Sequence, residues 1–84
     1  MVLYDFYADW CGPCKMMSPI IDQLEAERPD IEIIRVNVDE HPETSDDFGV
    51  RSIPTYVLKR TDGSTVVRLQ GAMPRAKFYE SLGI

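Results

Sequence analysis

The two cysteines of the chain, Cys11 and Cys14, lie three residues apart in the segment DWCGPCK, and the chain has no others. A pair this close cannot staple distant elements together, and disulfide-built secreted domains of this size usually carry several cysteine pairs at spread positions. A chain of 84 residues with 44% hydrophobic content can instead bury one compact core. We therefore predict a single domain over residues 1–84, in which the cysteines form either a redox pair or part of a zinc site.

Charge and hydropathy argue against two classes of partner. Fourteen acidic and nine basic residues give a net charge of −5, and the acids are scattered, so the chain has no basic footprint for nucleic acid. No stretch approaches the roughly 20 apolar residues that span a bilayer, and the N-terminus lacks a basic region followed by a long apolar run. We expect a cytoplasmic protein without nucleic-acid or membrane partners, provided that the chain is complete.

The first three predicted elements follow from hydrophobic periodicity. Residues 2–8 are rich in β-branched and aromatic side chains and predict a central strand. Apolar residues recur at helical spacing from Cys11 to about Glu27, which indicates an amphipathic helix. Residues 31–39 form a second strand-like run. A helix between two strands predicts a βαβ crossover with parallel strands.

Four further elements complete the predicted order β-α-β, short helix, β-β-α. They are a short helix within residues 40–49, two strands at 53–59 and 65–71, and a closing helix within 73–84. We expect Thr44 or Ser45 near the start of the short helix, because hydroxyl side chains cap helices well. The pair Asp62-Gly63 is a strong hairpin signal, and Pro74 suits the first turn of the closing helix.

The spacing of the cysteines fits exchange chemistry. If Cys11 caps the helix, Cys14 falls in its first turn on the same face, with about 5–6 Å between Cβ atoms. A disulfide then needs no large backbone movement, and in the reduced pair one thiol can attack a mixed disulfide formed by the other. The helix N-terminus stabilises a thiolate at Cys11, while burial would favour the neutral thiol at Cys14. We predict that Cys11 is the nucleophile and Cys14 the resolving thiol.

Asp5 stands in the middle of an apolar strand, where an unpaired carboxylate is costly. Strand alternation puts Leu3, Asp5 and Tyr7 on one face, which the cysteine helix should cover. We predict that Asp5 lies beneath the cysteine pair, has a raised pKa and accepts the proton of Cys14 directly or through water. The alternative is a solvated aspartate at a strand edge.

These residues resemble a known family. YDFYADWCGPCKMMSPI is similar to the active-site strand and helix of thioredoxins, VNVDE to their next strand, GVRSIPT to their cis-proline loop and DGSTVVRLQGA to their final hairpin. The resemblance covers nearly all of the chain. It implies an α/β thioredoxin fold, with a central four-stranded mixed sheet of order 2-1-3-4 flanked by helices.

The resemblance also implies roles by position. Cys11 resembles the family's nucleophile, Cys14 its resolving cysteine, Asp5 its buried proton acceptor and Pro54 its cis-proline, which would expose the backbone of Ile53 to an incoming peptide. The family's flat apolar docking face corresponds to Trp10, Gly12, Pro13, Ile53, Pro54, Gly71 and Ala72. No cofactor and no metal are implied. The implied partners are disulfide-containing client proteins and a thioredoxin reductase-like enzyme or another thiol donor.

The chain departs from the family pattern in three places. Thioredoxins usually begin with an extra strand and helix, whereas this chain starts directly at Val2, so we expect a minimal version whose second strand is an edge. That edge could aid dimerisation, or the chain could be a piece of a longer one; we expect a monomer. Arg35 stands where a lysine is common near the buried acid, and Tyr7 where a tryptophan is common. Both changes should tune activity without abolishing it.

Three alternatives stay open beside a reducing thiol-disulfide oxidoreductase. A glutaredoxin-like enzyme recycled by glutathione is suggested by the short N-terminus, although Gly-Pro between the cysteines resembles thioredoxin. A closed zinc site needs four ligands, and His41 is the only histidine. A non-catalytic docking subunit could use the same fold.

Overall fold

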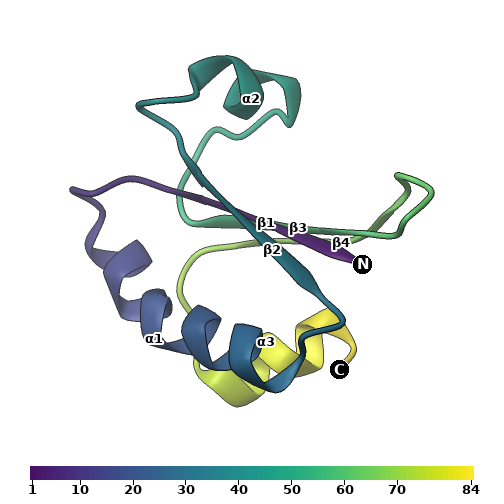
Figure 1. Cartoon of the computed structure of the whole chain (residues 1–84). Helices are drawn as coiled ribbons and strands as arrows, with labels where there is room; N and C mark the ends of the chain where they lie inside the picture. Colours follow the sequence, from purple (N-terminus) through teal and green to yellow (C-terminus); the bar gives the residue numbers. More distant parts are fainter.

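A four-stranded mixed β-sheet forms the centre of the chain, whose computed structural model describes residues 1–84 (Figure 1). In chain order the elements are β1 (Val2–Tyr7), α1 (Gly12–Glu27), β2 (Glu32–Asn37), α2 (Pro42–Asp47), β3 (Thr55–Lys59), β4 (Thr65–Gln70) and α3 (Arg75–Leu82). The strands lie in the order β2-β1-β3-β4, with β1 parallel to β2 and the other pairs antiparallel. The predicted fold class and sheet order are confirmed.

Two helices begin at different residues from those predicted. The short helix α2 starts at Pro42, before Thr44 and Ser45, because proline has a helix-compatible φ and its missing N–H needs no partner in the first turn. Ser45 lies inside the helix, where its hydroxyl donates to the carbonyl of His41 at 3.3 Å. The closing helix α3 starts at Arg75, so Pro74 is its cap residue and not part of its first turn.

Helices α1 and α3 cover one face of the sheet, and α2 lies on the other (Figure 1). The larger core cluster lies under α1 and α3 and consists of Leu3, Met17, Ile21, Leu24, Ile31, Tyr56, Leu58, Phe78 and Leu82. On the opposite face, Phe6, Val36 and Val57 are buried and Phe48 packs against them. Because β1 is covered on both faces, it anchors the segment that leads to the cysteines. None of the helices is long and apolar enough to cross a bilayer.

Candidate active site

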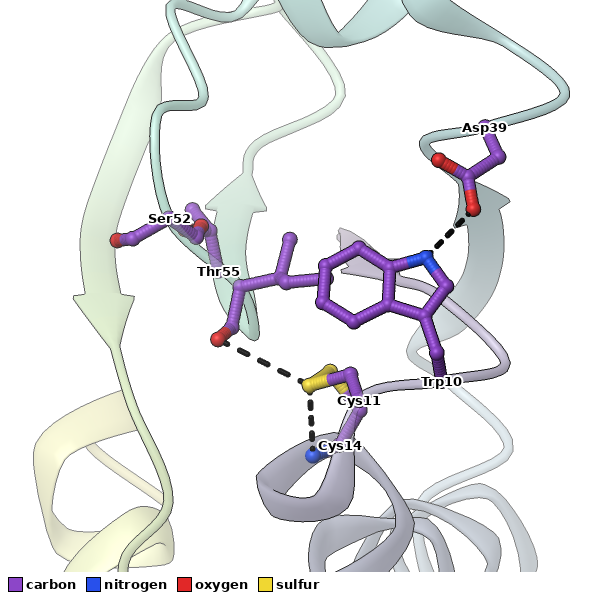
Figure 2. Close-up of a disulfide and its surroundings, with 7 residues drawn as sticks. Trp10, Cys11, Cys14, Asp39, Ser52 and Thr55 are labelled. Atoms are coloured by element: carbon purple, nitrogen blue, oxygen red, sulfur yellow. Dashed lines mark hydrogen bonds between the residues drawn. A yellow bond between two sulfur atoms is a disulfide. The ribbon is translucent and has the colours of Figure 1, made fainter.

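The cysteine pair stands where β1 gives way to α1. Cys11 is the N-cap residue of α1 and Cys14 lies in its first turn, as the spacing predicted. The two sulfurs form a disulfide, with the Cα atoms 5.2 Å apart. The backbone N–H of Cys14 donates to Cys11 Sγ at 3.2 Å (Figure 2). A thiolate at Cys11 would therefore meet an N–H donor that is already in place at the positive end of the helix.

Burial does not separate the two cysteines in the way that the sequence suggested. We expected Cys14 to be the more desolvated, but Cys11 is 4% exposed and Cys14 8%. Cys11 is covered because the loop before β3 crosses it, with the carbonyl oxygen of Ile53 3.9 Å from its Sγ. The sulfur carries no proton in the disulfide, so this is a contact and becomes a hydrogen bond only for the thiol. The two sulfurs differ instead in their surroundings, because Cys14 borders the cleft that contains Asp5 and Cys11 does not.

Asp5 and Cys14 line one cleft of about 300 Å³ on the α1 side of the sheet. Asp5 is only 7% exposed. This burial raises the pKa of its carboxyl to about 6, against the opposing effect of the positive charge of Arg35. The position of Asp5 beneath the helix and its raised pKa are those expected from its place in an apolar strand. Its role in proton transfer stays a prediction.

Trp10 is the large apolar side chain that the site presents to solvent, with 69% of its surface exposed. Its indole Nε1 donates to Asp39 Oδ2 at 2.7 Å (Figure 2). Trp10 and Ile53 line one groove of about 170 Å³. Gly12 and Pro13, at the start of α1, are exposed next to Trp10 in the chain. The structure thus brings four of the predicted docking residues to the same end of the molecule as the disulfide.

The loop before β3 and the residues that follow β4 contribute the rest of the predicted docking face. The Ile53–Pro54 peptide bond is cis, and Ile53 packs against the cysteine cluster. The N–H of Gly71 donates to the carbonyl of Pro54 at 2.9 Å, which places Gly71 and the adjoining Ala72 beside this loop. Contrary to its predicted place on the surface, Pro54 is buried. Its ring fills space beneath the loop, so it shapes the docking face without offering contact area.

Comparison with known proteins agrees with this geometry. The family model for thioredoxin matches residues 1–83. The chain belongs to the thioredoxin family. It is 49% identical over 71 residues to a thioredoxin of Chlamydia caviae, covering 84% of this chain and 69% of the relative. It is 43% identical over 81 residues to a thioredoxin of Listeria monocytogenes, covering 95% and 78%.

Solved thioredoxin structures share the architecture as well as the sequence. Mitochondrial thioredoxin 3 of Saccharomyces cerevisiae, in its oxidised form, superimposes with a TM-score of 0.86 at 37% identity, covering 99% of this chain and 77% of the other. Thioredoxin of Fasciola hepatica gives a TM-score of 0.87 at 35% identity, covering 98% and 77%. With a disulfide at the Cys-X-X-Cys position, this member of the thioredoxin family is a thiol-disulfide oxidoreductase that acts on protein disulfides.

The metal alternative finds no counterpart in the side-chain arrangement. No group of three or more His, Cys, Asp or Glu side chains is placed to hold a metal ion. His41 is the N-cap residue of α2, and its Nδ1 lies 3.8 Å from Glu43 Oε1. The thioredoxin relationship assigns redox chemistry to the cysteines instead.

Sequence reasoning missed the partner of Trp10. Asp39 follows β2 and Trp10 follows β1, 29 residues apart in the chain. The two strands are parallel, so the segments that follow them meet at one end of the sheet. Parallel pairing was the available signal, although it could not single out Asp39 among the polar residues of that segment. The hydrogen bond from Thr55 Oγ1 to the carbonyl of Ser52, 2.6 Å long, was likewise missed.

Proposed function

We propose that the protein reduces disulfides of client proteins, with Cys11 as the nucleophile and Cys14 as the resolving thiol. The Cys11 thiolate attacks one sulfur of the client disulfide, forms a mixed disulfide and expels the other client sulfur as a thiolate. Cys14 then loses its proton and attacks Cys11 Sγ, which releases the second client sulfur and closes the Cys11–Cys14 disulfide. Two electrons pass from the pair to the client, and the two client thiolates become thiols by taking up the proton released by Cys14 and one proton from the solvent.

The observation that carries this proposal is the N–H of Cys14 directed at Cys11 Sγ at the start of α1. A thiolate is the attacking form of cysteine, and a helix N-terminus with a free N–H donor stabilises it. Cys14 has no such donor in the structure, and it borders the cleft of Asp5. This asymmetry supports attack by Cys11 and resolution by Cys14.

Asp5 is the proposed acceptor of the Cys14 proton. A carboxyl with a pKa of about 6 is largely ionised at neutral pH and is a stronger base than an ordinary aspartate. It shares the cleft with Cys14, and the cleft is large enough to hold water, so transfer can run directly or through a bridging molecule. The proton acquired by Asp5 leaves through the same cleft.

Client proteins should dock on Trp10, Ile53 and their neighbours. Replacing Trp10 with alanine should raise the KM for insulin about tenfold, because an exposed aromatic anchor typically contributes a large share of the binding energy of an interface. The rate with hydroxyethyl disulfide should stay nearly unchanged, since a small substrate needs little docking area. Steady-state kinetics with both substrates measure the difference.

Met16→Ala is the matched control for the Trp10 variant. Met16 is equally prominent on the surface, with 71% of its area exposed, but it lies outside the groove that Trp10 and Ile53 share. An equal rise in KM for the Met16 variant would refute a docking role specific to Trp10.

The proposed direction is reduction, with electrons supplied by a thioredoxin reductase-like flavoprotein or another thiol donor, in the cytoplasm. Equilibration of the pair with glutathione or dithiothreitol buffers should give a potential more reducing than the glutathione pool, which lies at about −220 to −260 mV. Insulin should be reduced by the same sample. A distinctly oxidising couple would make the protein a disulfide donor, and efficient turnover with glutathione alone would favour the glutaredoxin-like alternative.

A further inference from the structure

The parallel pairing of β1 and β2 places a cation beside Asp5. Asp5 is the register partner of Arg35, so both side chains leave the sheet on the face covered by α1. Both also line the cleft that Cys14 borders. An arginine at this position can reach the carboxylate of its neighbour, and such a contact would strongly favour the ionised form of Asp5.

The guanidinium of Arg35 is instead bound by two carboxylates of α1. Its Nη2 lies 2.7 Å from Asp22 Oδ1, and its Nη1 lies 3.4 Å from Glu25 Oε2. Asp22 and Glu25 are three residues apart and so project from the same side of the helix. No nitrogen of Arg35 comes within 4.0 Å of an Asp5 oxygen. Arg35 therefore crosses from the sheet to the helix and does not pair with its nearest acid along the sheet.

Other polar groups also face Asp5 from the surrounding elements. They are Tyr56 from β3, Cys14 and Lys15 from α1, Tyr7 from β1, Asp9 from the connection after β1, and Arg35 from β2. Burial, together with the charge of Asp5, raises the pKa of Tyr56, so its hydroxyl stays neutral. Arg35 is the cation whose positive charge opposes the effect of burial on the pKa of the Asp5 carboxyl. Burial is the larger influence on the Asp5 pKa, and the distance of the Arg35 guanidinium sets how far its charge opposes that influence.

We propose that Asp22 and Glu25 are positioning residues for the redox reaction, because they hold the Arg35 guanidinium against α1 and keep it out of contact with Asp5. The proposal rests on the proposed function, in which Asp5 accepts the Cys14 proton. If Arg35 swung onto Asp5, the carboxylate would be stabilised and would become a weaker base for that proton. Two carboxylates facing one guanidinium also offset its charge locally. The Arg35, Asp22 and Glu25 cluster therefore keeps Asp5 in the range where it can both take and release a proton.

The test is the variant Asp22→Asn/Glu25→Gln, which removes both charges and keeps both shapes. Asp22 and Glu25 side chains are 67% and 53% exposed, so the variant should fold. NMR titration of the Asp5 carboxyl carbon in the reduced protein should show its midpoint lowered by about one pH unit. The acidic limb of the pH profile for insulin reduction should move by the same amount.

Arg35→Gln supplies the background that separates positioning from direct charge effects. If Asp22 and Glu25 act through Arg35, their substitution should move the Asp5 midpoint far less once the guanidinium is absent. An equal movement in both backgrounds would mean that the two carboxylates act on Asp5 directly, and it would overturn the proposal. So would an unmoved midpoint in the Arg35-containing variant.

Two further variants complete the comparison. Asp30→Asn/Glu43→Gln removes two exposed charges elsewhere and should leave the Asp5 midpoint in place. Asp5→Asn tests the proposed function separately, because it should remove the acidic limb of the activity profile. If that limb persists in Asp5→Asn, Asp5 is not the proton acceptor. The NMR midpoint still decides whether Asp22 and Glu25 position Arg35, because it does not depend on activity.

Discussion

Replacing Cys14 with serine should stop multiple-turnover insulin reduction, with a loss on the order of a thousandfold or more. The hydroxyl of serine cannot attack the mixed disulfide, whereas Cys11 and its N–H donor remain. The client should therefore accumulate as a covalent adduct on Cys11. Non-reducing electrophoresis and intact-mass measurement would detect the adduct, and addition of dithiothreitol should release it.

Cys11→Ser is the counterpart that shows which sulfur attacks. It should lose turnover equally but form no adduct, because the buried sulfur of Cys14 lacks the helix N-terminal donor. Adducts on Cys14 in this variant, at the rate seen for Cys11, would reverse the proposed roles. Undiminished turnover of Cys14→Ser with glutathione would instead indicate a glutaredoxin-like monothiol reaction.

Replacing Asp5 with asparagine should stabilise the protein at neutral pH while slowing its chemistry. Burial raises the Asp5 pKa from its ordinary value of 3.8 to about 6, so folding disfavours the ionised carboxylate. The difference of about two pH units, at 1.36 kcal/mol for each unit, corresponds to about 3 kcal/mol gained at pH 7. Without the acceptor, resolution of the mixed disulfide should slow on the order of a hundredfold at that pH.

Because the pKa of Asp5 is raised in the folded state, the stability gained by Asp5→Asn should depend on pH. The folded state binds the proton more tightly than the unfolded chain, so the wild-type protein loses stability as pH rises from about 4 to about 6. Asp5→Asn should thus match the wild type at pH 3 and gain its full advantage at pH 7. Urea unfolding at the two pH values measures this difference. An advantage of equal size at pH 3 would contradict burial of the charge as its cause.

Asp30→Asn is the matched control, because the pKa of Asp30 is shifted in the opposite direction from that of Asp5. Its hydrogen bond with the Arg28 guanidinium lowers the pKa of the exposed Asp30 carboxyl. Its replacement should bring no gain at neutral pH, because no buried charge is removed. A similar gain from both aspartates would point to the protein's net negative charge and away from Asp5.

Features that depend on neighbouring residues could be predicted from the sequence, whereas many contacts between distant segments could not. β-branched and aromatic composition, helical spacing, and turn and capping residues predicted the seven elements, and a carboxylate inside an apolar strand was enough to single out Asp5. Contacts between distant segments were predicted less well. The family resemblance placed the Ile53 backbone, 42 residues away, beside the cysteines, but it did not predict that this loop buries Cys11 more than Cys14. The contact between Asp39 and Trp10, 29 residues apart, was missed, because a contact made by a single side chain leaves no periodic pattern in the sequence.

The surroundings of Asp5 were also only partly predicted, because the direction taken by the Arg35 side chain does not follow from the sequence. The sequence placed Arg35 near the buried acid, but it could not say that the guanidinium would reach α1. Whether the Arg35 guanidinium reaches α1 depends on where the axis of α1 crosses β2, and packing of the whole core sets that position. The difference matters, because Arg35 favours the ionised form of Asp5 more strongly when it touches the carboxylate than when it stays against α1.

The short ring closed by the disulfide links folding to electron transfer. The two half-cystines are separated by three positions in the chain, so oxidation restricts the unfolded chain only modestly, by about 2 kcal/mol in the chain-entropy view. A thermodynamic cycle connects stability to reduction potential. The oxidised and reduced forms differ in unfolding free energy, and this difference equals the difference in reduction potential between the native and the unfolded protein, expressed as a free energy. About 30 mV corresponds to 1.4 kcal/mol for two electrons. Any substitution that stabilises the oxidised fold more than the reduced one therefore makes the protein a stronger electron donor, and denaturation curves of the two forms report its redox poise.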